Sequence, residues 1–327
     1  MSHKGSEDDD LVWQIGDAEP GRSRPVAEQH VRGRSRLNAN IVLIGVGLAV
    51  LALAAFWVYR WSTAQNAQAA LREHITAEDQ AARARDAEAL LARAASADPA
   101  LSAWLQTLAG AGLAAPTPDL GLTPTASDPE LSFVTLGDVA QVQVIRTYRD
   151  ADGVAYRYGY DQFYERRANG WQRMPAPDTY WGTPDTFWGS RVAIVYAGPD
   201  RDLVVDDVGP HIERVLVRLC SSLSCVAEVF PIRISLDVAY PPEYVLEGGW
   251  REGRFLSPRI AGMPVDGPTL ERYRQNLTGW AYLQAASRMF LDETGAPDVD
   301  RLTLVGVCIG ALPGERDLQA CLDAGIR

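Results

Sequence analysis

Zinc-dependent hydrolysis is the first chemistry for which we searched the residue types of this chain. A hydrolase of the His-Glu-x-x-His type needs two histidines one helical turn apart, a third ligand and a glutamate that activates water. The helix expected over residues 268–290, PTLERYRQNLTGWAYLQAASRMF, contains no histidine. Beyond residue 62 the chain has only His74 and His211, and it has no Gly-x-Ser-x-Gly motif for a serine nucleophile. We therefore expect no catalytic triad, no bound metal and no cofactor.

Carboxylates offer scattered candidates for other chemistry. Glu247 and Glu252 flank GGWR and could act as an acid–base pair in hydrolysis, although their spacing fixes no separation. Asp202, Asp206 and Asp207 lack the alternating ligands and the glycine of a calcium loop. We expect these aspartates to stabilise the start of a helix through its dipole.

The cysteines suggest disulfides. All four, Cys220, Cys225, Cys308 and Cys321, follow the apolar segment near the N-terminus. An even number on an oxidising side of a membrane is typical of disulfide bonding. Of the three possible connectivities, the short spacings favour Cys220–Cys225 and Cys308–Cys321. Free thiols and a metal site are the alternatives, and the Cys-x4-Cys spacing lies at the loose edge of zinc-ligand spacing.

Aromatic residues with polar tips gather in and after the strands expected over residues 139–174. Alternate positions place many of them on one face of a curved sheet. There they would either line a ligand pocket or pack against helices with their hydroxyls at the edge. The candidate pocket residues are Tyr148, Tyr156, Tyr158, Tyr160, Tyr164, Trp171 and Trp181.

Composition and one apolar segment indicate where the chain lies. It has 327 residues, a net charge of −11 and a pI near 4.9, so it lacks the basic surface of a nucleic-acid-binding protein. No charge occurs between Ile41 and Tyr59, which is long enough for one membrane span. Five arginines lie within residues 22–36, which predicts a cytoplasmic N-terminus. A cleaved signal peptide is the alternative, but about 40 residues would then precede its apolar region.

Helical and strand periodicities alternate along the remainder. Residues 63–97 favour helix throughout, and Asp98-Pro99 would end it. Alternation predicts strands over residues 139–149 and 154–166, with a return strand at 171–174 after Asn169-Gly170. The other expected elements are a helix over 100–113, a Pro/Thr-rich connection over 115–130, a linker over 175–189, strands at 191–196, 231–239 and 301–310, and helices over 200–219 and 268–290.

Two segments resemble known domains. FYERRANGW (residues 163–171), within a sheet preceded by two helices, resembles NTF2-like domains of bacterial single-pass envelope proteins. RFLSPRIAGMP (residues 254–264) resembles the zinc-peptidase-like half that follows such domains. That half would here be degenerate, because its next helix lacks His-Glu-x-x-His.

The patterns and the resemblance together predict an α+β protein with an N-terminal transmembrane helix. Its expected parts are a disordered cytoplasmic tail (1–38), the span (39–61), an NTF2-like extracytoplasmic domain with a curved antiparallel sheet (62–182), and a small mixed α/β peptidase-like domain (183–327).

The expected function is that of a non-catalytic, membrane-anchored protein that binds a protein or a small ligand outside the cell, or acts as a scaffold. One alternative is an envelope hydrolase that uses carboxylates. Another is a transmembrane regulator whose tail, through LVWQI (residues 11–15), binds a cytoplasmic factor.

Overall fold

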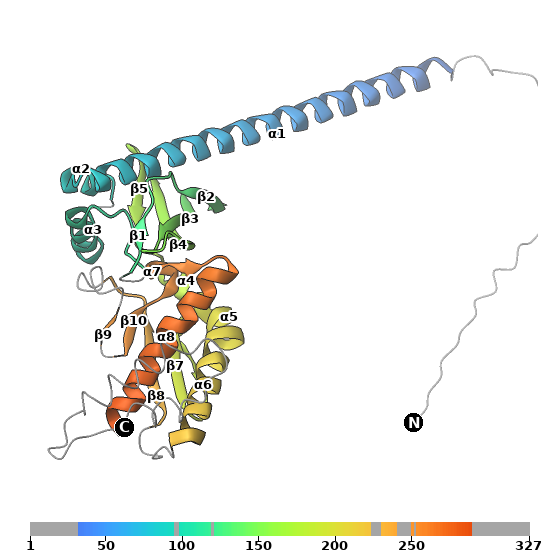
Figure 1. Ribbon diagram of the computed structural model, residues 1–327. Helices are drawn as coiled ribbons and strands as arrows, with labels where there is room; N and C mark the ends of the chain where they lie inside the picture. Colours follow the sequence, from blue (N-terminus) through green and yellow to red (C-terminus); the bar gives the residue numbers. More distant parts are fainter. Residues whose placement is uncertain are drawn as a thin grey trace, which may run out of the picture. The chain divides into compact units, whose positions relative to one another are not determined.

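Figure 1 shows the computed structural model of the chain. The structure describes residues 32–94, 98–118, 121–223, 230–240, 250–251 and 253–289. The chain divides into two compact units, Met1–Trp61 and Ser62–Arg327. The expected strand at 301–310, the tail motif at 11–15 and the Glu247/Glu252 pair lie outside the described residues.

The first described element is the long helix α1 (Arg32–Arg83). From Leu43 to Trp61 its apolar side chains are exposed, with Leu43, Leu51 and Trp57 each 67–69% exposed. Length and composition make α1 the candidate membrane span of the described residues. This confirms a long apolar helix near the N-terminus.

The predicted helix over 63–97 ends early. α1 stops at Arg83, Arg85 adopts a left-handed φ of 57°, and α2 (Ala87–Leu91) follows after the N-cap Asp86. The reversal brings Ala82 and Leu90 into one apolar cluster. The residues around the turn all favour a continuous helix. We therefore attribute the turn to the burial of this apolar cluster.

Helix α3 (Pro99–Ala111) confirms the second predicted helix. The Asp98 side chain accepts a hydrogen bond from the backbone N–H of Leu101 at 2.9 Å, and Pro99 occupies the first turn, where no N–H is needed. Gly112 ends the helix with a φ of 72°. The periodic apolar positions Trp104 and Leu108 are buried, as their spacing predicts.

The first sheet is antiparallel and confirms the expected hairpins. Its long strands are β3 (Val139–Arg149) and β4 (Ala155–Arg167), joined by a turn in which Asp150 accepts from the N–H groups of Asp152 and Val154. β5 (Gly170–Met174) pairs with β4 after the Gly170 turn. β1 (Thr123–Pro124) and β2 (Glu130–Leu136) pair with β3. β1 lies within the segment expected as a connection over 115–130, and β2, which follows that segment, was not predicted.

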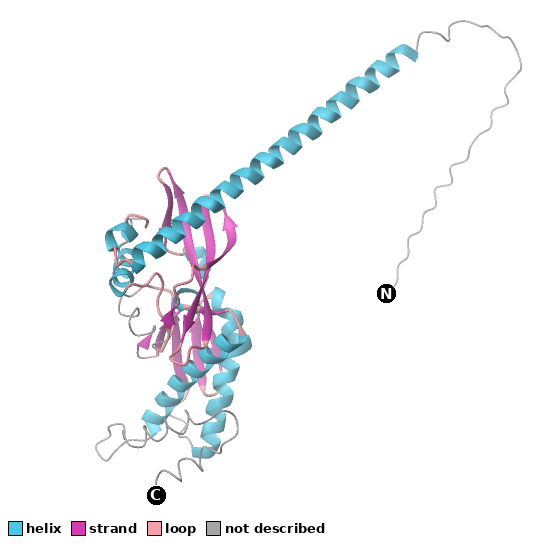
Figure 2. Ribbon diagram, turned by 45° about the horizontal axis from the view of Figure 1, so that its top comes forward, coloured by secondary structure: helices cyan, strands magenta, loops and turns pink. Residues whose placement is uncertain are grey.

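One face of this sheet packs against the part of α1 in the second unit, which crosses the strands in Figure 2. Leu71 and Ile75 of α1 are buried against Val142 and Val144 of β3. Alternate residues of a strand point to opposite faces. The even-numbered positions of β3 and β4 are therefore the ones directed at the helices.

The second sheet is mixed and has the order β6-β7-β8-β10-β9. β7, β8 and β10 are parallel to one another, and β6 and β9 are antiparallel edge strands. The strands are β6 (Asp185–Trp188), β7 (Val192–Tyr196), β8 (Ile232–Asp237), β9 (Trp250–Arg251) and β10 (Arg254–Leu256). The expected linker over 175–189 therefore contains β6, as well as the short helix α4 (Asp178–Trp181).

Helices α6 (Gly209–Leu223) and α8 (Gly267–Met289) lie side by side over β7 and β8 (Figure 1). Their buried residues, among them Ile212 and Ala281, form one apolar cluster with Ile194 and Ile234 of the sheet. Before α6 come η1 (Gly198–Asp200), α5 (Arg201–Leu203) and the π-helical turn η2 (Val204–Val208). The predicted helix over 200–219 is thus irregular in its first two turns.

The two sheets are joined by more than the chain connection. After β10 come α7 (Pro258–Ala261) and β11 (Met263–Pro264), and β11 pairs with β4 of the first sheet. Gly262 precedes β11 with a φ of 125°, and a side chain there would meet Tyr158 at 3.1–3.2 Å. The hydroxyl of Thr269 on α8 also accepts from the backbone N–H of Arg157 at 2.9 Å.

Replacing Thr269 with valine is expected to lower the free energy of unfolding by about 1–3 kcal/mol, because the Arg157 N–H loses its acceptor. Thr269 is 0% exposed, so valine keeps the packing. Thr278→Val on the same helix is the matched control, since the buried Thr278 hydroxyl forms no hydrogen bond within the described part of the chain. Urea unfolding of the full-length protein should show no loss for the control, and equal losses for both variants would contradict the assignment.

Candidate functional site

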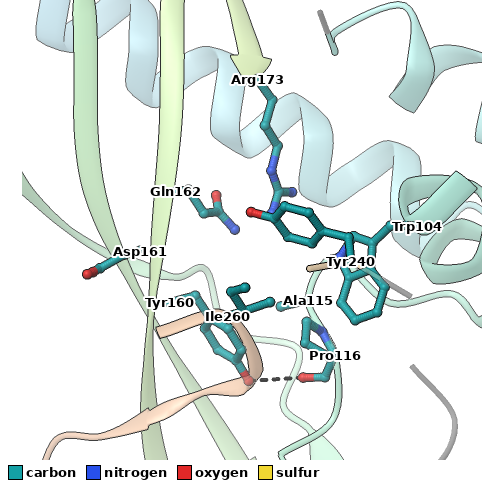
Figure 3. A pocket seen from close by; sticks show the side chains of 9 residues that line it. All are labelled: Trp104, Ala115, Pro116, Tyr160, Asp161, Gln162, Arg173, Tyr240 and Ile260. Carbon is teal, nitrogen blue, oxygen red and sulfur yellow. Dashed lines mark hydrogen bonds between the residues drawn. The ribbon is translucent and has the colours of Figure 1, made fainter. Parts of the chain in front are cut away.

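A small polar cavity lies between the first sheet, α3 and the end of the β8 segment. Its volume is about 10 Å³, which is room for one water-sized particle. Figure 3 shows the residues that line it. They are Trp104, Ala115, Pro116, Tyr160, Asp161, Gln162, Arg173, Tyr240 and Ile260.

Arg173 is the cation of this cavity. It lies on β5 directly opposite Tyr164 of β4, and its backbone N–H donates to the carbonyl of Arg93 at 2.9 Å. The residue is 8% exposed. Figure 3 shows its side chain pointing into the cavity toward the Tyr240 hydroxyl. Its guanidinium forms no ion pair with a carboxylate of the described residues.

Gln162 is oriented by a buried chain of polar groups. The Tyr164 hydroxyl lies 2.7 Å from Gln162 Oε1 and 2.9 Å from Glu78 Oε2, and His74 Nε2 lies 3.3 Å from Glu78 Oε1. Burial raises the pKa of Tyr164 well above its usual value, and the Glu78 charge adds to this. The Tyr164 hydroxyl has one hydrogen to donate, so Glu78 and Gln162 compete for it.

Two further buried tyrosines lie at one side of the cavity, and one of them, Tyr160, lines it. The Tyr148 and Tyr160 hydroxyls are 2.6 Å apart, and the Tyr160 hydroxyl donates to the Pro116 carbonyl at 3.0 Å (Figure 3). Burial raises the pKa of Tyr148 to about 12 and that of Tyr160 well above its usual value. Both phenols are therefore protonated donors at neutral pH.

An ion pair fixes α1 to the sheet beside these tyrosines. Asp79 of α1 accepts two hydrogen bonds from the Arg146 guanidinium of β3 and one from Arg83 at 3.3 Å. Asp79 is 3% exposed. Burial would lower the pKa of Arg146, but the bonds and charge of Asp79 overcome this and raise it.

Asp161 lines the cavity but is turned away from it in Figure 3. Its carboxylate accepts from the Tyr180 hydroxyl and lies 3.5 Å from the Arg259 guanidinium. Arg259 also donates to the Pro199 carbonyl, at 2.8 Å for Nη2. This network joins β4 to α7, so the Asp161 charge is already compensated.

A second carboxylate lies in the same junction. Asp200 Oδ2 accepts from the Ser257 hydroxyl at 2.7 Å, and both residues are 0% exposed. Burial raises the pKa of Asp200 to about 7. A serine beside an aspartate can suggest a nucleophile, but a fully enclosed pair presents no atom to a substrate. The pair fixes the connection between β10 and α7.

The structure separates the residues of the predicted aromatic stripe. Tyr160 lines the cavity, whereas Tyr148, Tyr158 and Tyr156 pack in an adjoining apolar cluster. The other three residues, Tyr164, Trp171 and Trp181, are buried at 0%, 6% and 9% exposure in two further clusters.

The other predicted site residues lie elsewhere. Cys220 at the end of α6 is disulfide-bonded, and Cys225, Cys308 and Cys321 lie outside the described residues, so the pairing stays a prediction. Asp207 is paired with Arg274.

His211, in the first turn of α6, has a pKa lowered by burial. Within the described part of the chain, no group of three or more histidine, cysteine or acidic side chains could hold a metal ion.

Arg173, Gln162, Trp104 and Tyr240 were not predicted as a site. Arg173 shares one face of a short strand with Trp171. An arginine at such an inward position is the sequence feature that could have indicated this site. Sequence alternation cannot indicate which polar groups from three distant segments meet there.

No protein-family model, curated protein or solved structure matches this chain. The resemblance to NTF2-like and peptidase-like domains accordingly stays a prediction.

Proposed function

We propose that this protein is a membrane-anchored binding protein without catalytic activity, whose part after residue 62 lies outside the cytoplasm. The exposed apolar side chains of α1 over residues 43–61 support the membrane anchor, since exposure of so continuous an apolar surface to water is energetically unfavourable. The arginines within residues 22–36 support a cytoplasmic N-terminus.

The observation that carries the binding function is the buried Arg173 guanidinium directed into a polar cavity. Arg173 has no carboxylate within ion-pair distance among the described residues, and a buried charge that nothing compensates is costly to the fold. The lining residues supply an amide, phenols and aromatic surface, which are groups that orient a ligand. A cavity of about 10 Å³ has room for one water-sized group.

The experiment is native mass spectrometry of the full-length protein released from membranes. We expect a bound mass beyond that of the chain, which Arg173→Met removes. The matched control is Arg166→Met, because Arg166 is exposed on the same hairpin. If the bound mass is still present in Arg173→Met, or if no bound mass is found, the proposal that this cavity is the binding site is contradicted.

The orientation of the protein in the membrane is tested by a separate measurement. In sealed vesicles that retain the native orientation, protease added outside should degrade the part after residue 62 and leave a fragment that carries the N-terminus. Protection of residues 62–327 until detergent is added would reverse the proposed orientation.

A further inference from the structure

Two carboxylates share one arginine where the two sheets meet. Arg259 of α7 places Nη1 3.5 Å from Asp161 Oδ2 of β4, and Nε 4.0 Å from Asp200 Oδ1 at the end of η1. The same guanidinium donates two hydrogen bonds to the neutral carbonyl of Pro199, at 2.8 and 3.2 Å. One positive charge therefore faces two acids, and ionisation of both would leave a net negative charge in a buried junction.

Asp161 is the better compensated of the two acids. It lies nearer to the guanidinium and also accepts a hydrogen bond from the Tyr180 hydroxyl of α4. Asp200 is 0% exposed, and its Oδ2 accepts from the Ser257 hydroxyl at 2.7 Å. Its Oδ1 accepts no hydrogen bond within the described part of the chain. Ionisation is therefore less favourable for Asp200 than for Asp161.

The two phenols near Asp200 cannot compensate its charge. Burial raises the pKa of Tyr273 on α8 and that of Tyr180, and the Asp200 charge raises both further, so both hydroxyls stay neutral. Burial also raises the pKa of Asp200 to about 7, against the opposing effects of Ser257 and Arg259. Asp200 accordingly changes its charge in the neutral pH range.

Helix α7 is the element bound most directly to Asp200. The Ser257 hydroxyl that donates to Asp200 also accepts from the Arg259 N–H at 3.2 Å, and so caps the first turn of α7. This helix has only four residues and leads into β11, whose two residues pair with β4. Such short elements have few contacts to hold them. Displacement of α7 is therefore the least costly way for water to reach an ionised Asp200.

We propose that Asp200 and α7 form a proton-controlled latch between the two sheets. The latch is closed while Asp200 is protonated, and α7 and β11 detach from β4 when Asp200 releases its proton to solvent. Because Ile260 of α7 lines the polar cavity, opening also exposes this cavity to solvent. The latch does not depend on the binding function proposed above, since it rests on the Asp200 junction alone.

The test is hydrogen–deuterium exchange of the full-length protein in detergent, followed by mass spectrometry between pH 6 and pH 8. The peptides of interest cover α7 and β11, where the N–H groups of Ala261 and Val265 donate to the carbonyls of Ser257 and Arg157 at 2.9 and 3.2 Å. Protection factors are compared, because they correct for the pH dependence of exchange in an unstructured chain.

We expect the protection factors of α7 and β11 to fall about 10-fold from pH 6 to pH 8. This is the change for a carboxyl whose pKa is about 7 when the latch is closed and returns to its ordinary value when the latch opens. They should also lie below those of β3 at every pH, because the opening is local.

Three variants assign the effect to the latch. Asp200→Asn keeps an acceptor for Ser257 but cannot ionise, so the fall should disappear. Asp202→Asn should keep the fall, because the Asp202 side chain is 89% exposed. Asp161→Asn leaves Arg259 to Asp200 alone, so the fall should move to lower pH. This third variant gives an answer even if Asp200→Asn does not fold.

Protection factors of α7 and β11 that stay constant between pH 6 and pH 8 in the unsubstituted protein would overturn the proposal. A fall that persists in Asp200→Asn, or one that Asp161→Asn does not move, would contradict it as well. Protection of α7 and β11 equal to that of β3 would show that they open only on global unfolding, and no latch would remain.

Discussion

Replacing Asp79 with alanine is expected to lower the free energy of unfolding by about 3–5 kcal/mol. Asp79 and Arg146 form a bidentate pair between α1 and β3, and their side chains are 4% and 12% exposed. Removing one partner leaves the other charge buried without compensation, which is the costly event. Among the described residues Arg146 Nε has no hydrogen-bond partner, and the other two guanidinium nitrogens both bond to Asp79.

The measurement is urea unfolding of the full-length protein in detergent. The matched control is Glu130→Ala, which breaks the ion pair with Arg157 at 2.7 Å between side chains that are 63% and 39% exposed. Exposed pairs contribute about 0–1 kcal/mol. A loss for Asp79→Ala no larger than that for Glu130→Ala would show that the buried pair does not anchor the helix.

The free energy of unfolding is expected to decrease between pH 4 and pH 7 because of the ionisation of Asp200. The Asp200→Asn variant should lack this contribution to the decrease. Burial raises the pKa of Asp200 from 3.8 to about 7. The folded state therefore binds the proton more tightly than the unfolded state does. The stabilisation is fully present below about pH 4 and is lost as the pH rises through about 7.

The size of this effect follows from the shift of about three pKa units, at about 1.4 kcal/mol for each unit. The unfolding free energy of Asp200→Asn minus that of the unsubstituted protein should rise by about 4 kcal/mol between pH 4 and pH 7, and then level off. Asp202→Asn is the control, because the Asp202 side chain is 89% exposed. A difference that stays constant or falls with pH would contradict a raised pKa.

Local patterns were sufficient for several elements. The alternating residues of β3 and β4, the Asn169-Gly170 turn and the Asp98-Pro99 start of α3 correspond to observed structure. The absence of histidine from residues 268–290 excludes the His-Glu-x-x-His site on α8. Each of these conclusions depends on residues within a few positions of one another, where period and side-chain chemistry act directly.

Other elements depended on distant residues. The segment over 175–189 looks like a linker, yet it contains β6, which gains its hydrogen bonds from β7. The helix predicted over 63–97 breaks after Arg83, where burial of Ala82 with Leu90 outweighs helix propensity. Neither packing partner can be identified from the local pattern.

The sequence by itself determined the apolar helix, the alternation of the first sheet and the lack of a histidine zinc motif, because these follow from residue type and period. The tertiary structure alone decided that Arg173 faces a small polar cavity, that Asp79 meets Arg146, and that β11 joins β4. The partners in these contacts lie 67 residues apart for Asp79 and Arg146. Contacts over such separations are selected by the packing of the whole unit, which no local pattern encodes.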